Sequence, residues 1–127
     1  MSYVRKSSQA YHEKETRARK VLELRFGVPL PETEVPVSGG VVYKFDLVSP
    51  DRKIVGEIRA SGFPARGKLR ETQIAEMCEA CLFLLGAKEA DMRLLVFTER
   101  EFYEPFVKTR QARVAASMGV ELLQVEA

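Results

Sequence analysis

The sequence predicts an α/β fold, a three-layer α/β/α sandwich in which helices cover both faces of a mixed sheet. Its 127 residues, 46% hydrophobic and 30% charged, suit one globular domain spanning residues 1–127. Hydrophobic periodicity switches repeatedly between helix and strand spacing along the chain. The run 92–98 (MRLLVFT) is continuously apolar, which is typical of a strand covered on both faces. The expected element order is therefore α, β, β, β, α, β, α, β.

The first helix is expected over residues 8–26, a segment rich in Glu, Lys, Arg, Ala and Leu that ends at Gly27. Its apolar stripe comprises Tyr11, Ala18, Leu22 and Phe26. Glu15 falls on the same stripe. A carboxylate on the side that faces the core is unusual, so its position there needs a physical reason.

A connector at 28–40 follows, with a short strand expected at 33–37. Two runs of alternating apolar residues, 41–48 and 54–61, flank the turn-forming sequence Ser49-Pro50-Asp51-Arg52. Such runs around a short turn predict a β-hairpin.

The C-terminal half alternates between helix and strand patterns. A loop is predicted at 61–67, followed by a helix at 68–85 capped by Gly86 and the strand at 92–98. The next helix is predicted to start at the capping-box pattern Thr98-Glu99-Arg100-Glu101, to restart near Pro105 and to end at Gly119. A strand at 120–125 follows.

Charge and composition exclude few functions. The formal net charge of +2 neither requires nor excludes a polyanionic partner. The N-terminus carries no apolar signal-peptide core, and no apolar stretch approaches the length that spans a bilayer. We therefore expect a cytoplasmic protein with no membrane partner, in which the two cysteines stay reduced.

The predicted hairpin brings charged residues onto one face. Hydrophobic matching selects the register in which Asp46 lies opposite Glu57 and Lys44 opposite Arg59. Facing carboxylates repel each other unless they are neutralised. The flanking cations could do so, and so could a divalent ion, since Mg²⁺ prefers carboxylate oxygens. A solvated, salt-bridged sheet face is the alternative interpretation.

The segment 44–59, KFDLVSPDRKIVGEIR, resembles the hairpin motif of the PD-(D/E)XK nuclease superfamily, the restriction-endonuclease-like fold. Members of that group place an Asp on one hairpin strand and a Glu-x-Lys on the next, within an αβββαβ core. The predicted element order fits that core, with the closing helix and strand as a C-terminal extension.

The resemblance implies a metal site and catalytic residues. Asp46 and Glu57 would bind the metal with their carboxylates, and Ile58 with its backbone carbonyl. Glu15 on the first helix would face the site as a further catalytic residue. Arg59 stands where the family usually has Lys; because Arg stays protonated it is a poor base, but it can neutralise charge on a phosphate.

The implied activity is Mg²⁺- or Mn²⁺-dependent hydrolysis of phosphodiester bonds, with DNA as the expected substrate. The residues expected to contact nucleic acid are Lys44, Arg66, Lys68, Arg70 and Gln73. A solvated basic loop is the alternative for this cluster. A catalytically inactive domain of the same fold, binding nucleic acid or a protein, remains open because of Arg59, as does a small subunit with a purely structural hairpin.

Other motifs are assigned structural roles. Cys78 and Cys81 form a C-x-x-C in mid-helix, where we expect core packing rather than redox or zinc chemistry. His12 is the single histidine and is expected at the surface. The aromatic segment 102–106 is expected to pack the last helix onto the sheet, with a homodimer contact as the alternative.

Overall fold

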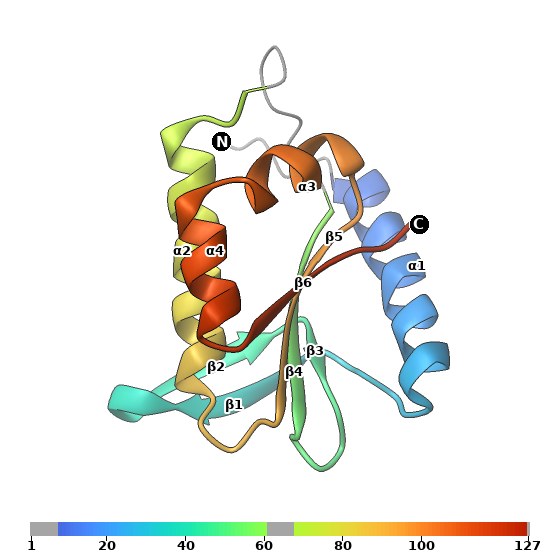
Figure 1. Ribbon diagram of the computed structural model, residues 1–127. Helices are drawn as coiled ribbons and strands as arrows, with labels where there is room; N and C mark the ends of the chain where they lie inside the picture. The colour runs from blue at the N-terminus through green and yellow to red at the C-terminus, as the bar shows by residue number, and fades with distance from the viewer. Residues whose placement is uncertain (1–7, 61–67, 127) are drawn as a thin grey trace.

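The computed structural model describes residues 8–60 and 68–126. It confirms an α/β fold with a mixed sheet (Figure 1). The elements are α1 (Ser8–Phe26), β1 (Thr33–Val37), a 3₁₀ turn η2 (Ser38–Gly40), β2 (Val41–Phe45), β3 (Leu47–Val48), β4 (Ile54–Arg59), α2 (Glu71–Gly86), β5 (Met92–Phe97), α3 (Arg100–Val107), α4 (Arg110–Ser117) and β6 (Val120–Gln124).

The main sheet has the strand order β3-β4-β5-β6, and β1 and β2 form a separate two-stranded sheet. β3 is antiparallel to β4, whereas β4, β5 and β6 are parallel. The predicted hairpin register is confirmed where the strands pair, with Leu47 opposite Gly56 and Val48 opposite Val55. Gly56 has a packing reason, because a Cβ there would lie 2.9 Å from Leu47 Cδ1 and 3.2 Å from Leu94 Cβ.

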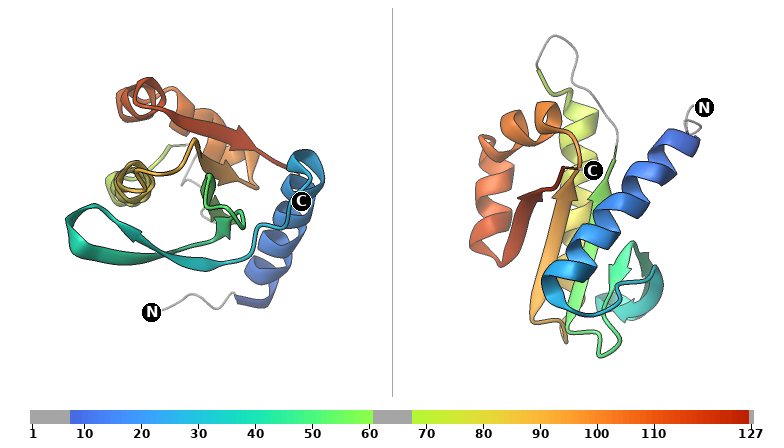
Figure 2. Two further views of the ribbon diagram at one scale, coloured as in Figure 1. Left: turned by 90° about the horizontal axis from the view of Figure 1, so that it is seen from below. Right: turned by 90° about the vertical axis from the view of Figure 1, so that its right-hand side faces the viewer.

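The two faces of the main sheet carry separate apolar clusters. α1 packs on one face, where Ala18 and Leu22 meet Leu94 and Val96. α2, α3 and α4 pack on the other face, on the opposite side of the sheet from α1 (Figure 2). Phe102 and Phe106 of α3 are buried there against Phe97, which confirms that these aromatics pack the helix onto the sheet.

Several predicted boundaries need correction. The run 41–48 is not one strand, because the chain breaks at Asp46 and β2 pairs with β1. The last helix breaks after Val107 rather than at Pro105, since the Thr109 side chain accepts a hydrogen bond from the backbone N–H of Ala112 (3.1 Å) and starts a new helix there.

Two predicted helix caps also differ. α3 begins at Arg100, but Glu99 at its N-cap makes no side-chain capping bond, so the predicted capping box is absent. Gly86 is the last residue of α2, and the C-cap is Ala87. The predicted loop 61–67 lies outside the described residues. Of the helices in the part of the chain that is described, none has the length and apolar character to cross a bilayer.

Candidate functional site

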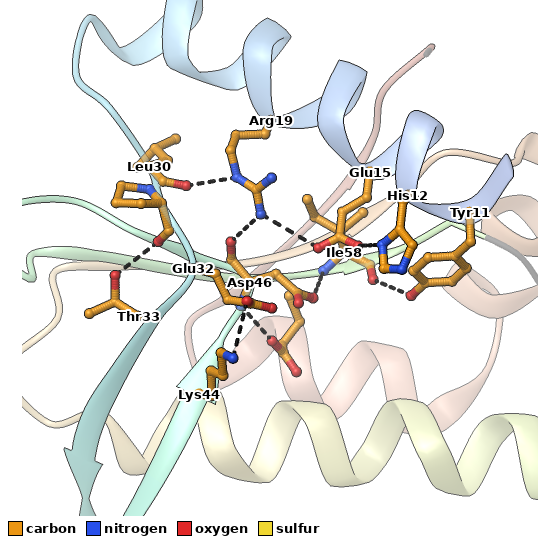
Figure 3. A network of polar contacts seen from close by, with 12 residues as sticks. Tyr11, His12, Glu15, Arg19, Leu30, Glu32, Thr33, Lys44, Asp46 and Ile58 are labelled. Carbon is orange, nitrogen blue, oxygen red and sulfur yellow. Dashed lines mark hydrogen bonds and ion pairs between the residues drawn. The ribbon is translucent and has the colours of Figure 1, made fainter. Parts of the chain in front are cut away.

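The candidate site lies along an open edge of β4. Within the described residues β3 pairs with β4 only through Leu47 and Val48, so the pairing of these two strands stops at Gly56. Side chains, rather than a neighbouring strand, make the hydrogen bonds to the backbone N–H and carbonyl of Ile58 at this edge. Its N–H donates to Asp46 Oδ2 (2.8 Å), and its carbonyl accepts from the Tyr11 hydroxyl (3.2 Å) (Figure 3). The break of the strand at Asp46 therefore places a carboxylate where a strand would otherwise pair.

Three carboxylates meet beside this edge. Glu15 comes from α1, Glu32 from the connector after α1, and Asp46 from the end of β2 (Figure 3). One carboxylate oxygen from each lies within 4.8 Å of the others. Glu15 is only 9% exposed, Asp46 is partly buried and Glu32 is exposed. The group thus extends from a buried carboxylate on α1 to an exposed one on the connector.

Two basic side chains, Arg19 and Lys44, lie next to the three carboxylates, but neither forms an ion pair with the Asp46 carboxylate. Arg19 donates to the Asp46 backbone carbonyl (2.8 Å) and to the Leu30 carbonyl (3.0 Å), and its guanidinium lies 3.5 Å from Glu15 Oε2. Lys44 Nζ lies 3.3 Å from Glu32 Oε1. Arg19 therefore fixes the chain on either side of the site, and each outer carboxylate has a cation partner.

Glu57 lies next to this group. Its Oε2 accepts from the Asp46 backbone N–H (3.1 Å), and its Oε1 accepts from the Tyr43 hydroxyl. Tyr43 is held in turn by stacking on Phe83 of α2 (centroids 4.1 Å apart). Asp46 and Glu57 are therefore adjacent as predicted, but the carboxylate group that could share one ion is Glu15, Glu32 and Asp46.

Burial raises the pKa of both central carboxyls. For Asp46, removal from water raises the pKa above its ordinary range and the neighbouring Glu57 charge raises it further. Burial likewise raises the Glu57 pKa, although hydrogen bonds from Tyr43 and Asp46 oppose the shift. The Tyr43 hydroxyl pKa also rises, through burial and its bond to Glu57. The site holds more acidic groups than its surroundings neutralise, so a proton or a cation stabilises it.

Arg59 makes its contacts away from these carboxylates. Its guanidinium pairs with Glu76 of α2 (2.7 Å) and lies 5.4 Å from the centroid of the Phe102 ring. Its buried Nε has no hydrogen-bond partner among the described residues. Arg59 therefore retains donor capacity but is held by α2.

The predicted nucleic-acid contacts are scattered. Lys44 is not opposite Arg59, as the register predicted, because β2 leaves the main sheet and Lys44 lies opposite Glu34 of β1. Lys68 and Arg70 are exposed near the start of α2, and Arg66 lies outside the described residues.

Gln73, the remaining predicted contact, is buried. Its Oε1 accepts from the Arg70 backbone N–H (2.9 Å), which caps the first turn of α2. The structure therefore gives Gln73 a helix-capping contact.

The cysteines and the histidine have simple environments. Cys81 is buried and its thiol pKa is raised to about 11 by burial, which disfavours the thiolate that redox chemistry needs. Cys78, expected in the core, is instead exposed. His12 is exposed as expected, with Nδ1 3.9 Å from Glu15 Oε1.

Sequence reasoning missed Glu32, Arg19 and Tyr43. Glu32 follows Pro31 in a segment without periodicity, so its position is set by tertiary structure alone. Arg19 had a detectable signal, because it lies four residues after Glu15 and eight after Tyr11 on one helical stripe.

Comparisons with known proteins do not assign the chain to a family. No protein-family model matches it. Searches of curated proteins and of solved structures also return no significant match. The function of the protein is therefore inferred from the geometry of the site.

Proposed function

We propose that the protein is a divalent-metal-dependent nuclease that hydrolyses phosphodiester bonds, with DNA as its substrate. The fold we infer is a three-layer α/β/α sandwich with a restriction-endonuclease-like αβββαβ core, extended by α4 and β6. The observation that carries the proposal is the convergence of Glu15, Glu32 and Asp46, from three separate segments, beside the buried Glu57.

The donor set fits a hard divalent cation. It offers carboxylate oxygens alone, which Mg²⁺ and Mn²⁺ favour over nitrogen or sulfur. Burial has raised the pKa of Asp46, so the ionised form of this side chain needs a positive partner. Neither Arg19 nor Lys44 forms an ion pair with the Asp46 carboxylate. Glu15, Glu32 and Asp46 would hold the ion, and the Ile58 carbonyl, which accepts one hydrogen bond from Tyr11, keeps a second lone pair for it.

When bound, such an ion supplies Lewis-acid polarisation of the phosphate and a nucleophile at neutral pH. The protein's own residues do the rest. Glu57, kept in place by Tyr43 and the Asp46 backbone, can accept a proton because its pKa is raised. Arg59, whose Nε has no hydrogen-bond partner in the described part of the chain, can bind a phosphate oxygen once it turns from Glu76. Lys44, Lys68 and Arg70 are exposed cations that can contact the substrate backbone without reading its sequence.

A cleavage assay tests this proposal. Purified protein is incubated with fluorescently labelled single- and double-stranded DNA, with matched RNA, and with EDTA, Mg²⁺ or Mn²⁺. We expect metal-dependent cleavage that Asp46→Asn abolishes and that Glu34→Gln retains. Glu34→Gln is a matched control because Glu34 is exposed on β1 and lies outside the group of three. Cleavage that survives Asp46→Asn, or no cleavage of any nucleic acid, contradicts the proposal.

A catalytically inactive domain that binds nucleic acid or a protein is the second candidate. The pairing of Arg59 with Glu76 favours it, because this contact turns the only cation on β4 away from the carboxylates. Glu76→Gln and Arg59→Lys distinguish the two. If the protein is a nuclease limited by Arg59, both variants should raise the cleavage rate. Binding of DNA without cleavage by wild type and both variants supports the inactive domain.

A further inference from the structure

α2 and α4 lie side by side on the face of the main sheet opposite α1 (Figures 1 and 2). Side chains of both helices line an apolar groove. Its volume is about 480 Å³. Its lining includes Cys78, Leu82 and Leu85 from α2 and Val114, Ala115 and Met118 at α4 and its C-terminal end. None of these residues belongs to the carboxylate site, so the groove is a separate surface.

Three large side chains at this groove are unusually exposed. Leu82 is 69% exposed, Val114 57% and Met118 58%. They come from two neighbouring helices and all belong to the lining of the same groove. Contiguous exposed apolar side chains are characteristic of a surface that another molecule covers.

The two helices that form the groove carry opposite charges, and Arg110 is the charged residue in the groove lining itself. α2 contains three glutamates and no basic residue, and α4 contains two arginines and no acidic residue. Glu79, Arg110 and Arg113 are all exposed. Within the described part of the chain none of these three forms an ion pair. The surface therefore presents one acidic and one basic helix, both with unused charge.

α2 and α4 run in the same direction. Each helix connects toward the next of the parallel strands β4, β5 and β6, so both run antiparallel to those strands. A two-fold axis parallel to the helices would place α2 of one chain over α4 of the other, twice, in the same orientation. Acidic α2 would then face basic α4 in both halves of the contact, and the apolar groove would close against its own copy.

We propose that this surface binds a second copy of the chain, forming a two-fold symmetric dimer. Leu82 of each chain packs against Val114 and Met118 of the other, and Glu79 faces Arg110 and Arg113. The proposal does not depend on the nuclease activity. The alternative of a dimer contact at 102–106 is not supported for Phe102 and Phe106, because both are buried inside the chain.

Charge-swap variants test the proposal by sedimentation velocity over a concentration series. We expect the wild type to dimerise, and both Glu79→Arg and the double variant Arg110→Glu/Arg113→Glu to weaken dimerisation by at least about tenfold through like-charge contact. An equimolar mixture of the two variants should restore the dimer, because each chain then supplies the charge that the other lacks. This restoration is specific to a contact in which α2 faces α4.

Apolar variants give a second readout. Leu82→Glu should also weaken the dimer, whereas Leu24→Glu, at an 86% exposed leucine on α1, should leave it unchanged. Thermal unfolding checks that each variant folds, which the exposure of the replaced side chains favours. A wild type that stays monomeric throughout the series, a mixture that does not restore the dimer, or equal effects of Leu82→Glu and Leu24→Glu overturns the proposal.

Discussion

The helices on the two faces of the main sheet make different kinds of contact with it. α2, α3 and α4 hold their face through aromatic and aliphatic packing around Phe97. α1 combines apolar contacts with a polar stripe, in which Tyr11 bonds the Ile58 carbonyl of β4 and Arg19 bonds Glu15 and the Asp46 carbonyl. The helices on one face of the sheet therefore supply most of the apolar packing, whereas α1 on the other face also holds charged side chains in places where burying them is costly.

The largest expected effect is in the aromatic cluster. Phe97→Ala should lower the free energy of unfolding by about 3–5 kcal/mol, because a fully buried ring among Phe102 and Phe106 leaves a cavity. Urea denaturation measures the change. Leu82→Ala, at an exposed site, should change it by less than about 0.5 kcal/mol in dilute protein. Equal effects would show that the cluster does not stabilise the fold as described.

The polar stripe of α1 should depend most on Arg19. Arg19→Met keeps the aliphatic stem but leaves two backbone carbonyls and Glu15 without their donor. We expect a loss of about 2–3 kcal/mol in unfolding free energy, as for hydrogen bonds from a charged group. The matched control is Arg17→Met, at an exposed arginine on the same helix. If the two variants are equally stable, Arg19 does not anchor the connector to α1.

The raised pKa of Asp46 predicts a pH dependence of stability at the open edge of β4. Because the Asp46 pKa is raised in the folded protein, the native state binds more protons than the unfolded state above the ordinary carboxyl pKa. Its contribution to stability is therefore fully present at low pH and is lost as pH rises through the raised pKa. Asp46→Asn, which can still accept from the Ile58 N–H, should remove this loss.

Urea denaturation of the metal-free protein between about pH 5 and about pH 8 measures the difference, since each pKa unit corresponds to about 1.4 kcal/mol. The wild type should lose more stability across this range than Asp46→Asn. Parallel curves for the two proteins would contradict the assignment of a raised pKa to this carboxyl.

The smallest effect concerns the Tyr11 hydroxyl. Tyr11→Phe removes one hydrogen bond to the Ile58 carbonyl at the edge of β4 and should cost about 1 kcal/mol. Tyr103→Phe is the comparison from the other face, where the hydroxyl lies 3.5 Å from the Leu122 carbonyl and should contribute less. Thermal melts rank the two. A larger loss for Tyr103→Phe would reverse the distinction between the faces.

Much of the fold was predictable because its signals are local. Periodicity and the stop at Gly27 located α1 over Ser8–Phe26 without error, and alternation located β4. The break at Asp46 was not predictable, because 41–48 alternates without interruption. What separates β2 from β3 is pairing with β1, a tertiary interaction that overrides local pattern.

The site was predictable only in part for the same reason. Helical spacing turned Glu15 inward, and hairpin register brought Asp46 beside Glu57. Glu32 lies on an irregular connector, whose position depends on the Arg19 bonds to Leu30 and to Asp46. Neither helical periodicity nor strand register applies to such a segment, so the position of the third carboxylate, Glu32, could be found only from the structure.

A calorimetric titration with Mn²⁺ tests the central claim most directly, namely that Glu15, Glu32 and Asp46 together bind a divalent cation. We predict saturable single-site binding to the wild type and to Glu34→Gln. Glu15→Gln, Glu32→Gln and Asp46→Asn should each weaken binding by at least about tenfold, because each removes one charged ligand. Absence of saturable binding to the wild type, or equal affinity in all five proteins, would contradict the account.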